Sequence, residues 1–147
     1  MKDKTIDYVL RTTWLSVQKM YNEEATTIDS TMATGFTLLS IDPEKGTPST
    51  ALGPKMGMEA TSLTRILKTM EKNKLIERHP NPKDGRGVII RLTEFGREKR
   101  DFSRDKVLIF NDTIKNNVSE EQLNHFYEVA EVINDMVSNK KIYNQKD

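Results

Sequence analysis

Two groups of side chains near the middle of the chain have the chemistry to bind phosphates and base edges. The first is a set of hydroxyl and cationic residues: Thr61, Ser62, Thr64, Arg65 and Lys68. The second is a pair of cations, Lys83 and Arg86, within a turn-rich segment. Hydroxyl, ammonium and guanidinium groups donate hydrogen bonds to phosphate oxygens and to base edges in a groove. The two groups together indicate a surface for nucleic acid.

The first group depends on a helix that we expect over residues 58–72. Its apolar side chains have the spacing of one buried stripe: Leu63, Ile66, Leu67 and Met70. At about 100° per residue, the hydroxyl and cationic residues, joined by Lys72, point away from that stripe or lie on its flanks. None of these six residues is acidic, whereas most solvated helix faces mix charges of both signs. Phosphates and base edges explain this face better than solvent does.

The second group lies at the tip of an expected β-hairpin with strands at residues 75–79 and 88–92. Residues of period two share one face of the second strand: Val88, Ile90 and Leu92. The intervening prolines, glycines and Asx residues favour a long, stiff turn over residues 80–87. At its tip, Lys83 and Arg86 would suit a narrow groove lined with phosphates. Taken alone, the hairpin would be interpreted as an ordinary solvated loop.

A further short helix is expected upstream of both groups. Thr47 precedes Pro48 at a position typical of a first helical turn, and Pro54 and Gly57 limit how far the helix can run. Ser49, near its start, joins the candidate DNA contacts. Helix, turn, helix and hairpin, in that order, predict a winged helix-turn-helix within a mainly α fold that carries a small β-hairpin wing.

Charge is distributed unevenly along the chain. All 147 residues carry 23 basic and 22 acidic side chains, a formal charge of +1. Residues 58–100 hold eleven basic and six acidic residues, a balance of +5, so the remainder has a balance of −4. The positive charge therefore lies on the expected helix, the hairpin and the start of the next helix, which is typical of a nucleic-acid interface.

Composition argues against several other classes of protein. The absence of cysteine removes disulfides, thiolate metal sites and thiol-based oxidant sensing. His79 and His125 lack metal-ligand spacing, and no phosphate-binding loop or nucleophile motif is present. We therefore expect no enzyme activity, no metal and no cofactor. Without an apolar run of membrane-span length or a secretory leader, we expect a cytoplasmic protein with no membrane association.

Amphipathic helices are expected on both sides of the winged core. An N-terminal helix over about residues 5–24 carries apolar residues at helical spacing: Ile6, Val9, Leu10, Val17, Met20 and Tyr21. A second is expected over about residues 29–41. After the hairpin, Thr93 can cap a long helix, and the run from Ser119 to Gln122 is a capping box for a last one. These flanking helices could pack within their own chain, but we expect the two ends to form a homodimer.

The sequence resembles the MarR family of bacterial transcription regulators over nearly its full length. The resemblance rests on Asp84-x-Arg86, on Leu92-Thr93-x-x-Gly96, and on residues 62–67 leading into residues 70–78. It implies one MarR-like domain over residues 1–147, with the winged core at about 28–100 and dimerisation helices at about 5–24 and 101–139. It also implies a homodimer that places two helices in successive major grooves of a pseudo-palindromic operator, with the wings in the adjacent minor grooves.

The resemblance also assigns roles to individual residues. Arg86 is implied to enter the minor groove, and Asp84 to brace the wing by pairing with a nearby cation. Two positions depart from the family pattern. Lys74 stands where the family usually has glycine, so either Asn73 or Lys74 must adopt the left-handed conformation that ends the helix. Pro54 lies inside the short helix and is expected to truncate or bend it.

Family members commonly act as repressors that a small ligand releases from DNA. For this chain the resemblance implies a pocket that involves Trp14, Met32 and Phe36, although the residues themselves favour the interpretation as plain hydrophobic core. Without cysteine, the expected effector is an aromatic, fatty or other hydrophobic ligand, or none at all. The alternative function is a winged-helix module that binds protein and not a specific DNA sequence.

Overall fold

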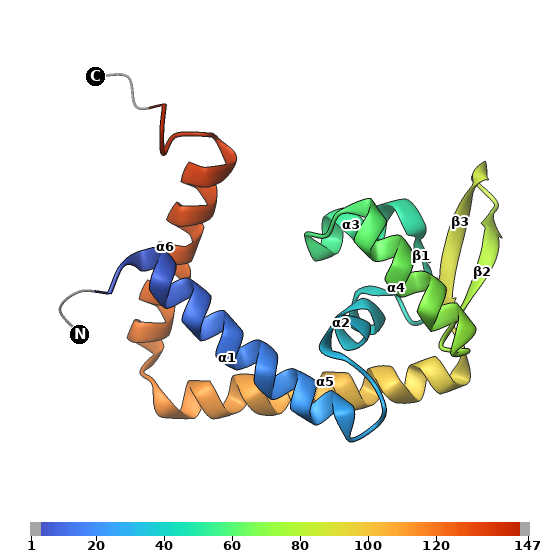
Figure 1. Cartoon of the computed structure of the whole chain (residues 1–147), viewed down its shortest axis with the longest axis horizontal. Helices are drawn as coiled ribbons and strands as arrows, with labels where there is room; N and C mark the ends of the chain where they lie inside the picture. The colour runs from blue at the N-terminus through green and yellow to red at the C-terminus, as the bar shows by residue number, and fades with distance from the viewer. Residues whose placement is uncertain (1–3, 145–147) are drawn as a thin grey trace. The chain divides into compact units, whose positions relative to one another are not determined.

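The computed structural model describes residues 4–144, which form six helices and a three-stranded antiparallel sheet (Figure 1). The chain divides into two compact units, residues 1–106 and 107–147, with the boundary inside α5 (Glu94–Asn117). Each unit is described by itself below. Among the described helices, none combines the length and hydrophobicity needed to cross a bilayer.

The first unit begins with two capped helices, as expected. In α1 (Ile6–Thr26) the Thr5 hydroxyl accepts a hydrogen bond from the Tyr8 backbone N–H at 3.3 Å. Helix α2 (Met32–Ser40) begins three residues later than the expected Asp29, because Asp29 has a φ of +52° and Thr31 caps the helix instead.

The short helix was expected to begin at Pro48, after Thr47, but it begins one residue later. Thr47 and Pro48 form the short strand β1 (Thr47–Pro48), which pairs with Ile90 and Ile89 of the hairpin. Pro48 lies at the outer edge of the sheet in an extended conformation, where its missing N–H costs no ladder hydrogen bond. Helix α3 (Ser49–Met56) follows immediately.

Pro54 lies inside α3 and does not end it. The helix continues to Met56 and stops at Gly57, which has a φ of +65°. The backbone N–H of Met58 then bonds to the Gly53 carbonyl at 2.9 Å, which closes the turn that leads into the next helix.

Helix α4 (Ala60–Lys72) buries the expected stripe and leads into the hairpin. Leu63, Leu67 and Met70 are buried, and Ile66 is half-buried. The hairpin consists of β2 (Ile76–Asn81) and β3 (Asp84–Leu92), and the order across the sheet is β1-β3-β2.

The tip of the hairpin is tighter than expected. Asn81 pairs with Asp84, so the turn contains only Pro82 and Lys83 and not the whole of residues 80–87. The pairing shifts between Pro80 and Asn81, where the ladder is irregular. Arg86 therefore belongs to β3, in the irregular stretch between Asp84 and Val88.

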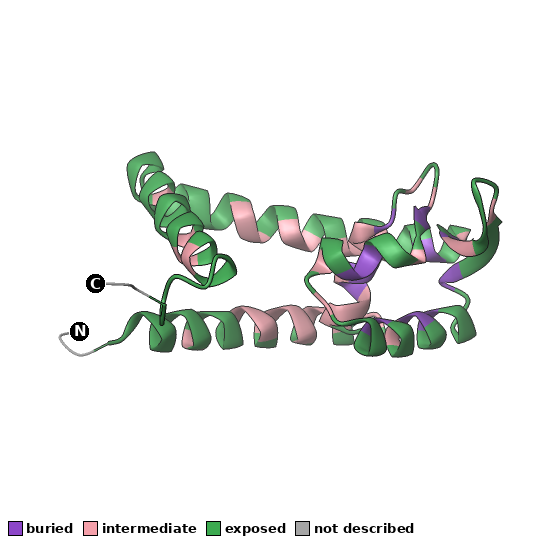
Figure 2. Ribbon diagram, turned by 90° about the horizontal axis from the view of Figure 1, so that it is seen from above, coloured by how far each residue is buried: buried purple, intermediate pink, exposed green. Residues whose placement is uncertain are grey.

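The hydrophobic core of the first unit joins α2, α3, α4 and the sheet. Its fully buried residues gather in the same region of the ribbon (Figure 2). The largest of them are Leu38, Ile41, Leu52, Met70, Ile76 and Ile90. Because this core anchors one face of α4 and the base of the hairpin, the opposite face of α4 and the hairpin tip remain exposed.

The second unit contains the end of α5 and helix α6 (Glu120–Ser138). The capping box is confirmed: Ser119 accepts from the Gln122 backbone N–H at 3.0 Å, and Gln122 accepts from the Ser119 N–H at 2.9 Å. No residue of α6 is buried, and several of its apolar side chains are exposed.

Candidate nucleic-acid interface

The outward face of α4 is the first part of the candidate site. All five predicted contacts on this helix are exposed: Thr61, Ser62, Thr64, Arg65 and Lys68. The Thr64 hydroxyl donates to the Ala60 carbonyl at 2.7 Å, so its proton is already engaged within the helix. Within the described residues, the donors of this face without a partner are therefore the hydroxyls of Thr61 and Ser62 and the two cations.

The acidic residue within α4, Glu71, is paired locally. A carboxylate oxygen of Glu71 lies 3.1 Å from the Nε of Arg78, on β2. Both side chains are partly exposed, so the pair contributes little to stability. Its consequence is electrostatic, because the pairing reduces the repulsion that Glu71 would otherwise exert on a phosphate near the end of α4.

We define the wing as the β2–β3 hairpin. The tip of the wing is ordered by two Asx side chains. Asn81 Oδ1 accepts from the Lys83 backbone N–H at 3.0 Å, and Asp84 Oδ1 accepts from the Arg86 backbone N–H at 3.1 Å. Both bonds fix the backbone and leave the Lys83 and Arg86 side chains exposed in solvent. The wing therefore presents two cations on a stiff backbone.

The expected role of Asp84 was correct as a brace but wrong in its partner. The carboxylate holds the backbone of Arg86, and within residues 4–144 no cation lies at ion-pair distance from it. An Asx turn of this kind needs only the local spacing of two residues. The bracing therefore comes from within the strand and not from a distant Lys or Arg.

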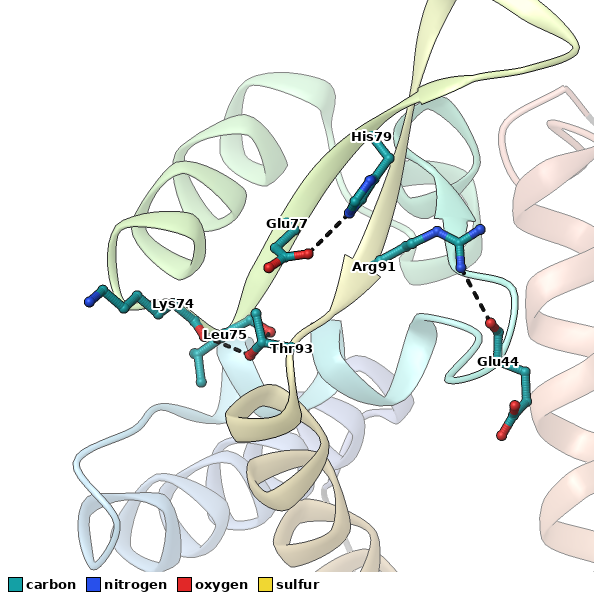
Figure 3. Close-up of polar contacts among 7 residues, drawn as sticks. All are labelled: Glu44, Lys74, Leu75, Glu77, His79, Arg91 and Thr93. Carbon is teal, nitrogen blue, oxygen red and sulfur yellow. Dashed lines mark hydrogen bonds and ion pairs between the residues drawn. The ribbon is translucent and has the colours of Figure 1, made fainter.

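Thr93 ties the base of the wing to α5 (Figure 3). Its hydroxyl donates to the Lys74 carbonyl at 2.6 Å and accepts from the Gly96 backbone N–H at 2.9 Å, so it caps α5 as expected. The Thr93 backbone N–H donates to the Leu75 carbonyl at 3.1 Å. The Leu-Thr-x-x-Gly segment thus joins the end of α4, the wing and α5 at one point.

Two backbone positions determine how the wing leaves α4. Lys74 takes the left-handed conformation with a φ of +60°, whereas Asn73 has a φ of −84°. Gly96 approaches the chain so closely that a Cβ there would lie 2.0 Å from the Leu75 carbonyl oxygen. The wing geometry is therefore preserved without glycine at position 74, but it requires glycine at position 96.

One face of the hairpin carries polar contacts that the sequence did not suggest (Figure 3). His79 Nε2 lies 3.1 Å from a carboxylate oxygen of Glu77, and Arg91, the cross-strand partner of Glu77, reaches the Glu44 carbonyl at 3.5 Å. The alternation of residues 77 and 79 would have placed them on one face. The Arg91 contact spans the loop before β1 and had no local signal.

A cleft of about 740 Å³ lies between the end of α4, β2 and the start of α5. Its charged lining holds four carboxylates against two cations, and so is acidic on balance: Glu71, Glu77, Glu94 and Glu98 with Lys74 and Arg78. These carboxylates would repel phosphates. The cleft is therefore separate in character from the hydroxyl and cationic face of α4 and from the wing tip.

The candidate ligand residues come together in part. The Trp14 and Phe36 rings stack with centroids 6.5 Å apart, and Tyr21 meets Phe36 edge-on at 5.6 Å. Met32 lies one helical turn before Phe36, and its backbone N–H donates to Asn22 Oδ1 at 3.0 Å. Within the single chain Trp14 is 48% exposed, whereas Met32 and Phe36 are half-buried.

Ser49, the predicted DNA contact outside α4 and the wing, is half-buried at the start of α3.

Comparison with known proteins gives matches consistent with this architecture. Residues 31–88, which run from the α2 cap into β3, match the MarR family model. The chain is 32% identical over 71 residues to YdgJ of Bacillus subtilis (strain 168), described as an uncharacterized HTH-type transcriptional regulator. The match covers 48% of this chain and 43% of that protein, so it spans less than half of the relative's length.

Solved structures share the fold at lower identity. The S. aureus MepR–DNA complex has a TM-score of 0.78 and 20% identity, covering 93% of this chain and 98% of MepR. The PcaV transcriptional regulator from Streptomyces coelicolor, solved with its natural ligand, has a TM-score of 0.77 and 15% identity, covering 91% and 94%. These likenesses establish the winged-helix fold. The family match over residues 31–88 covers the helix-turn-helix and most of the wing, so this part of the chain is similar to the MarR family.

Proposed function

We propose that this protein is a dimeric, sequence-specific DNA-binding repressor, and that a small hydrophobic or aromatic ligand releases it from DNA. The observation that supports DNA binding best is the outward face of α4. It carries hydroxyls and cations without an acidic residue, and Glu71, the acidic residue within α4, is paired with Arg78. A protein acting on DNA in this way would work in the bacterial cytoplasm.

The wing supplies a second, separate contact. Lys83 and Arg86 are exposed on a tip whose backbone is fixed by Asn81 and Asp84. A stiff tip loses less conformational entropy on binding than a flexible loop. We therefore assign Arg86 to the minor groove and Lys83 to phosphate, with Ser49 at the start of α3 as a further phosphate contact.

DNA binding is tested by capturing genomic fragments with the purified protein and measuring their affinity by fluorescence anisotropy. We expect enrichment of a pseudo-palindromic sequence, and a strong loss of affinity for it in Arg86→Ala. Lys19→Ala is a matched control, because it removes one exposed cation from α1. Absence of any enriched sequence, or equal affinities of both variants, would favour the protein-binding alternative.

A homodimer is proposed from the apolar surfaces that the helices leave uncovered. Helix α1 has no buried residue and exposes Ile6, Val9, Leu10, Trp14 and Leu15. Helix α6 likewise exposes Phe126, Val129, Val132 and Val137. Exposed apolar side chains in such numbers mark interaction surfaces in soluble proteins, and a second copy of the chain offers the same surfaces by symmetry.

The dimer is tested by light scattering after size exclusion. We expect twice the chain mass of 16.9 kDa for the wild type. Val132 is 62% exposed, so Val132→Glu should shift the protein towards the monomer without unfolding its own subunit. Glu131→Gln, at the neighbouring exposed position, is the control and should remain dimeric. A wild-type mass of one chain would contradict the proposal.

The effector is proposed to bind near the half-exposed aromatic cluster. Trp14, Phe36 and Met32 would supply an apolar surface with ring faces for an aromatic ligand. Trp14 is the only tryptophan in the chain, so its fluorescence reports binding directly. We expect small aromatic acids to quench the Trp14 fluorescence and, at the same concentrations, to lower the affinity for the operator. Quenching without any change in DNA affinity would separate the ligand site from regulation.

A further inference from the structure

One guanidinium lies in the part of α4 that would face the bases. At about 100° per residue, Thr61 and Arg65 lie within about 30° of the direction opposite the buried stripe. Lys68 and Lys72 share this direction but lie one and two turns nearer the C-terminal end. The N-terminal half of a recognition helix is the part that reaches base edges in the major groove. Among the donor residues in the N-terminal, base-facing half of α4, Arg65 therefore has the longest side chain.

The Arg65 guanidinium is not engaged elsewhere in the described chain. The side chain is exposed, and within residues 4–144 its nitrogens form no ion pair or hydrogen bond. Only its backbone carbonyl is engaged, by the Thr69 hydroxyl at 3.1 Å. In contrast, Arg78 and Arg104 are held by carboxylates at 3.1 and 3.2 Å. All five guanidinium donors of Arg65 are thus available to a ligand.

We propose that Arg65 is the specificity-determining residue of α4 and selects a guanine in each operator half-site. This proposal rests on the DNA binding proposed above. Guanine presents two acceptors, O6 and N7, in the major groove, and the planar guanidinium fork matches both. Adenine places a donor beside N7 and would repel half of the fork. Lys68 is a point charge without this geometry, so it contacts either phosphate or a single acceptor.

The proposal is tested with modified bases in the duplex selected by the wild-type protein. Each guanine is replaced in turn by 7-deazaguanine, which lacks the N7 acceptor, or by inosine, which keeps the major-groove edge. Affinities are measured for the wild type, Arg65→Ala, Arg65→Lys and the control Lys68→Ala. At one guanine per half-site, 7-deazaguanine should weaken wild-type and Lys68→Ala binding about tenfold, whereas inosine should not.

Arg65→Ala should lose this tenfold difference while still binding random duplex, because Arg65 is exposed and its removal leaves the core intact. Arg65→Lys should keep part of the difference, because an ammonium can still donate to N7. A 7-deazaguanine penalty that persists in Arg65→Ala, or a selected site without guanine, would overturn the proposal while leaving DNA binding in place. If the wild type bound no duplex, the proposed function would fail as well. Circular dichroism of each variant confirms that it is folded.

Discussion

At the junction between the wing and α5, the structure leaves no room for an added methyl group at position 96, so substitution there should destabilise the fold. We consider Gly96→Ala. A Cβ at this position would lie 2.0 Å from the Leu75 carbonyl oxygen, whereas real Cβ atoms essentially never approach closer than 3.0 Å. The start of α5 must therefore move away from Leu75 by about 1 Å, since a carbonyl in a packed backbone cannot yield as a side chain does.

The magnitude follows from what this movement disrupts. Forcing an extra methyl group into a packed site costs about 1–3 kcal/mol. The Thr93 N–H lies 3.1 Å from the Leu75 carbonyl, and a displacement of that size breaks this bond or the bond to Lys74, at about 1 kcal/mol each. We therefore expect the free energy of unfolding to fall by about 3 kcal/mol, with a parallel loss of operator affinity.

Urea unfolding followed by circular dichroism measures this loss, at one fixed protein concentration so that any dimer contributes equally. Gly85→Ala is the matched control, because a Cβ there meets nothing within 4 Å and its φ is not in the left-handed region. Gly85→Ala should stay within about 0.5 kcal/mol of the wild type. Equal unfolding free energies for the two variants would refute the reasoning about the junction.

Three further predictions concern backbone strain, DNA contacts and acid sensitivity. Lys74→Gly should raise the free energy of unfolding by about 1 kcal/mol in urea titrations, because Lys74 has a φ of +60°; a decrease would contradict the strain. Lys83→Ala should weaken specific and random duplexes alike, whereas Thr61→Ala should change base preference; equal losses in both variants would place base readout elsewhere. The backbone N–H groups of Lys45 and Glu44 hold the pKa of Asp42 below 3.8. Its carboxylate therefore stabilises the fold at neutral pH, and this contribution is lost as the pH falls through the lowered value. An NMR titration of Asp42 that gave 3.8 or more would contradict this, and Asp42→Asn should reduce the acid dependence of unfolding.

The sequence predicted the features that local periodicity and capping determine. The stripe of Leu63, Leu67 and Met70, the Thr93 cap and the capping box at Ser119 all appear in the structure. Each depends on residues within a few positions of one another, so the spacing alone is sufficient. The order of helices and hairpin followed from the same signals.

The errors arose where distant residues determine the local structure. Thr47 and Pro48 form a strand only because Ile89 and Ile90 pair with them, and no local signal reports that pairing. The tip was expected to be long because its composition is turn-rich, but cross-strand pairing of Asn81 and Asp84 shortens it. The requirement for Gly96 depends on where Leu75 lies, which the motif alone does not explain.

The candidate site was predicted in part for the same reason. The exposure of Arg65, Lys83 and Arg86 follows from helix and hairpin patterns, and the structure leaves all three in solvent. The stacking of Trp14 on Phe36 joins two helices, and it could be suggested only through the family resemblance. The partner of Asp84 was misassigned, because that resemblance implied a cation and a backbone amide two residues away was nearer.

The central claim is that the α4 face and the wing together bind a specific DNA sequence. Fluorescence anisotropy of the purified protein, with the captured duplex and a scrambled one over a range of salt concentrations, tests it most directly. We predict at least about a thousandfold preference for the captured duplex. We also predict that the logarithm of the association constant falls linearly with the logarithm of the salt concentration. Equal affinities for the two duplexes, or an affinity independent of salt, would contradict the claim.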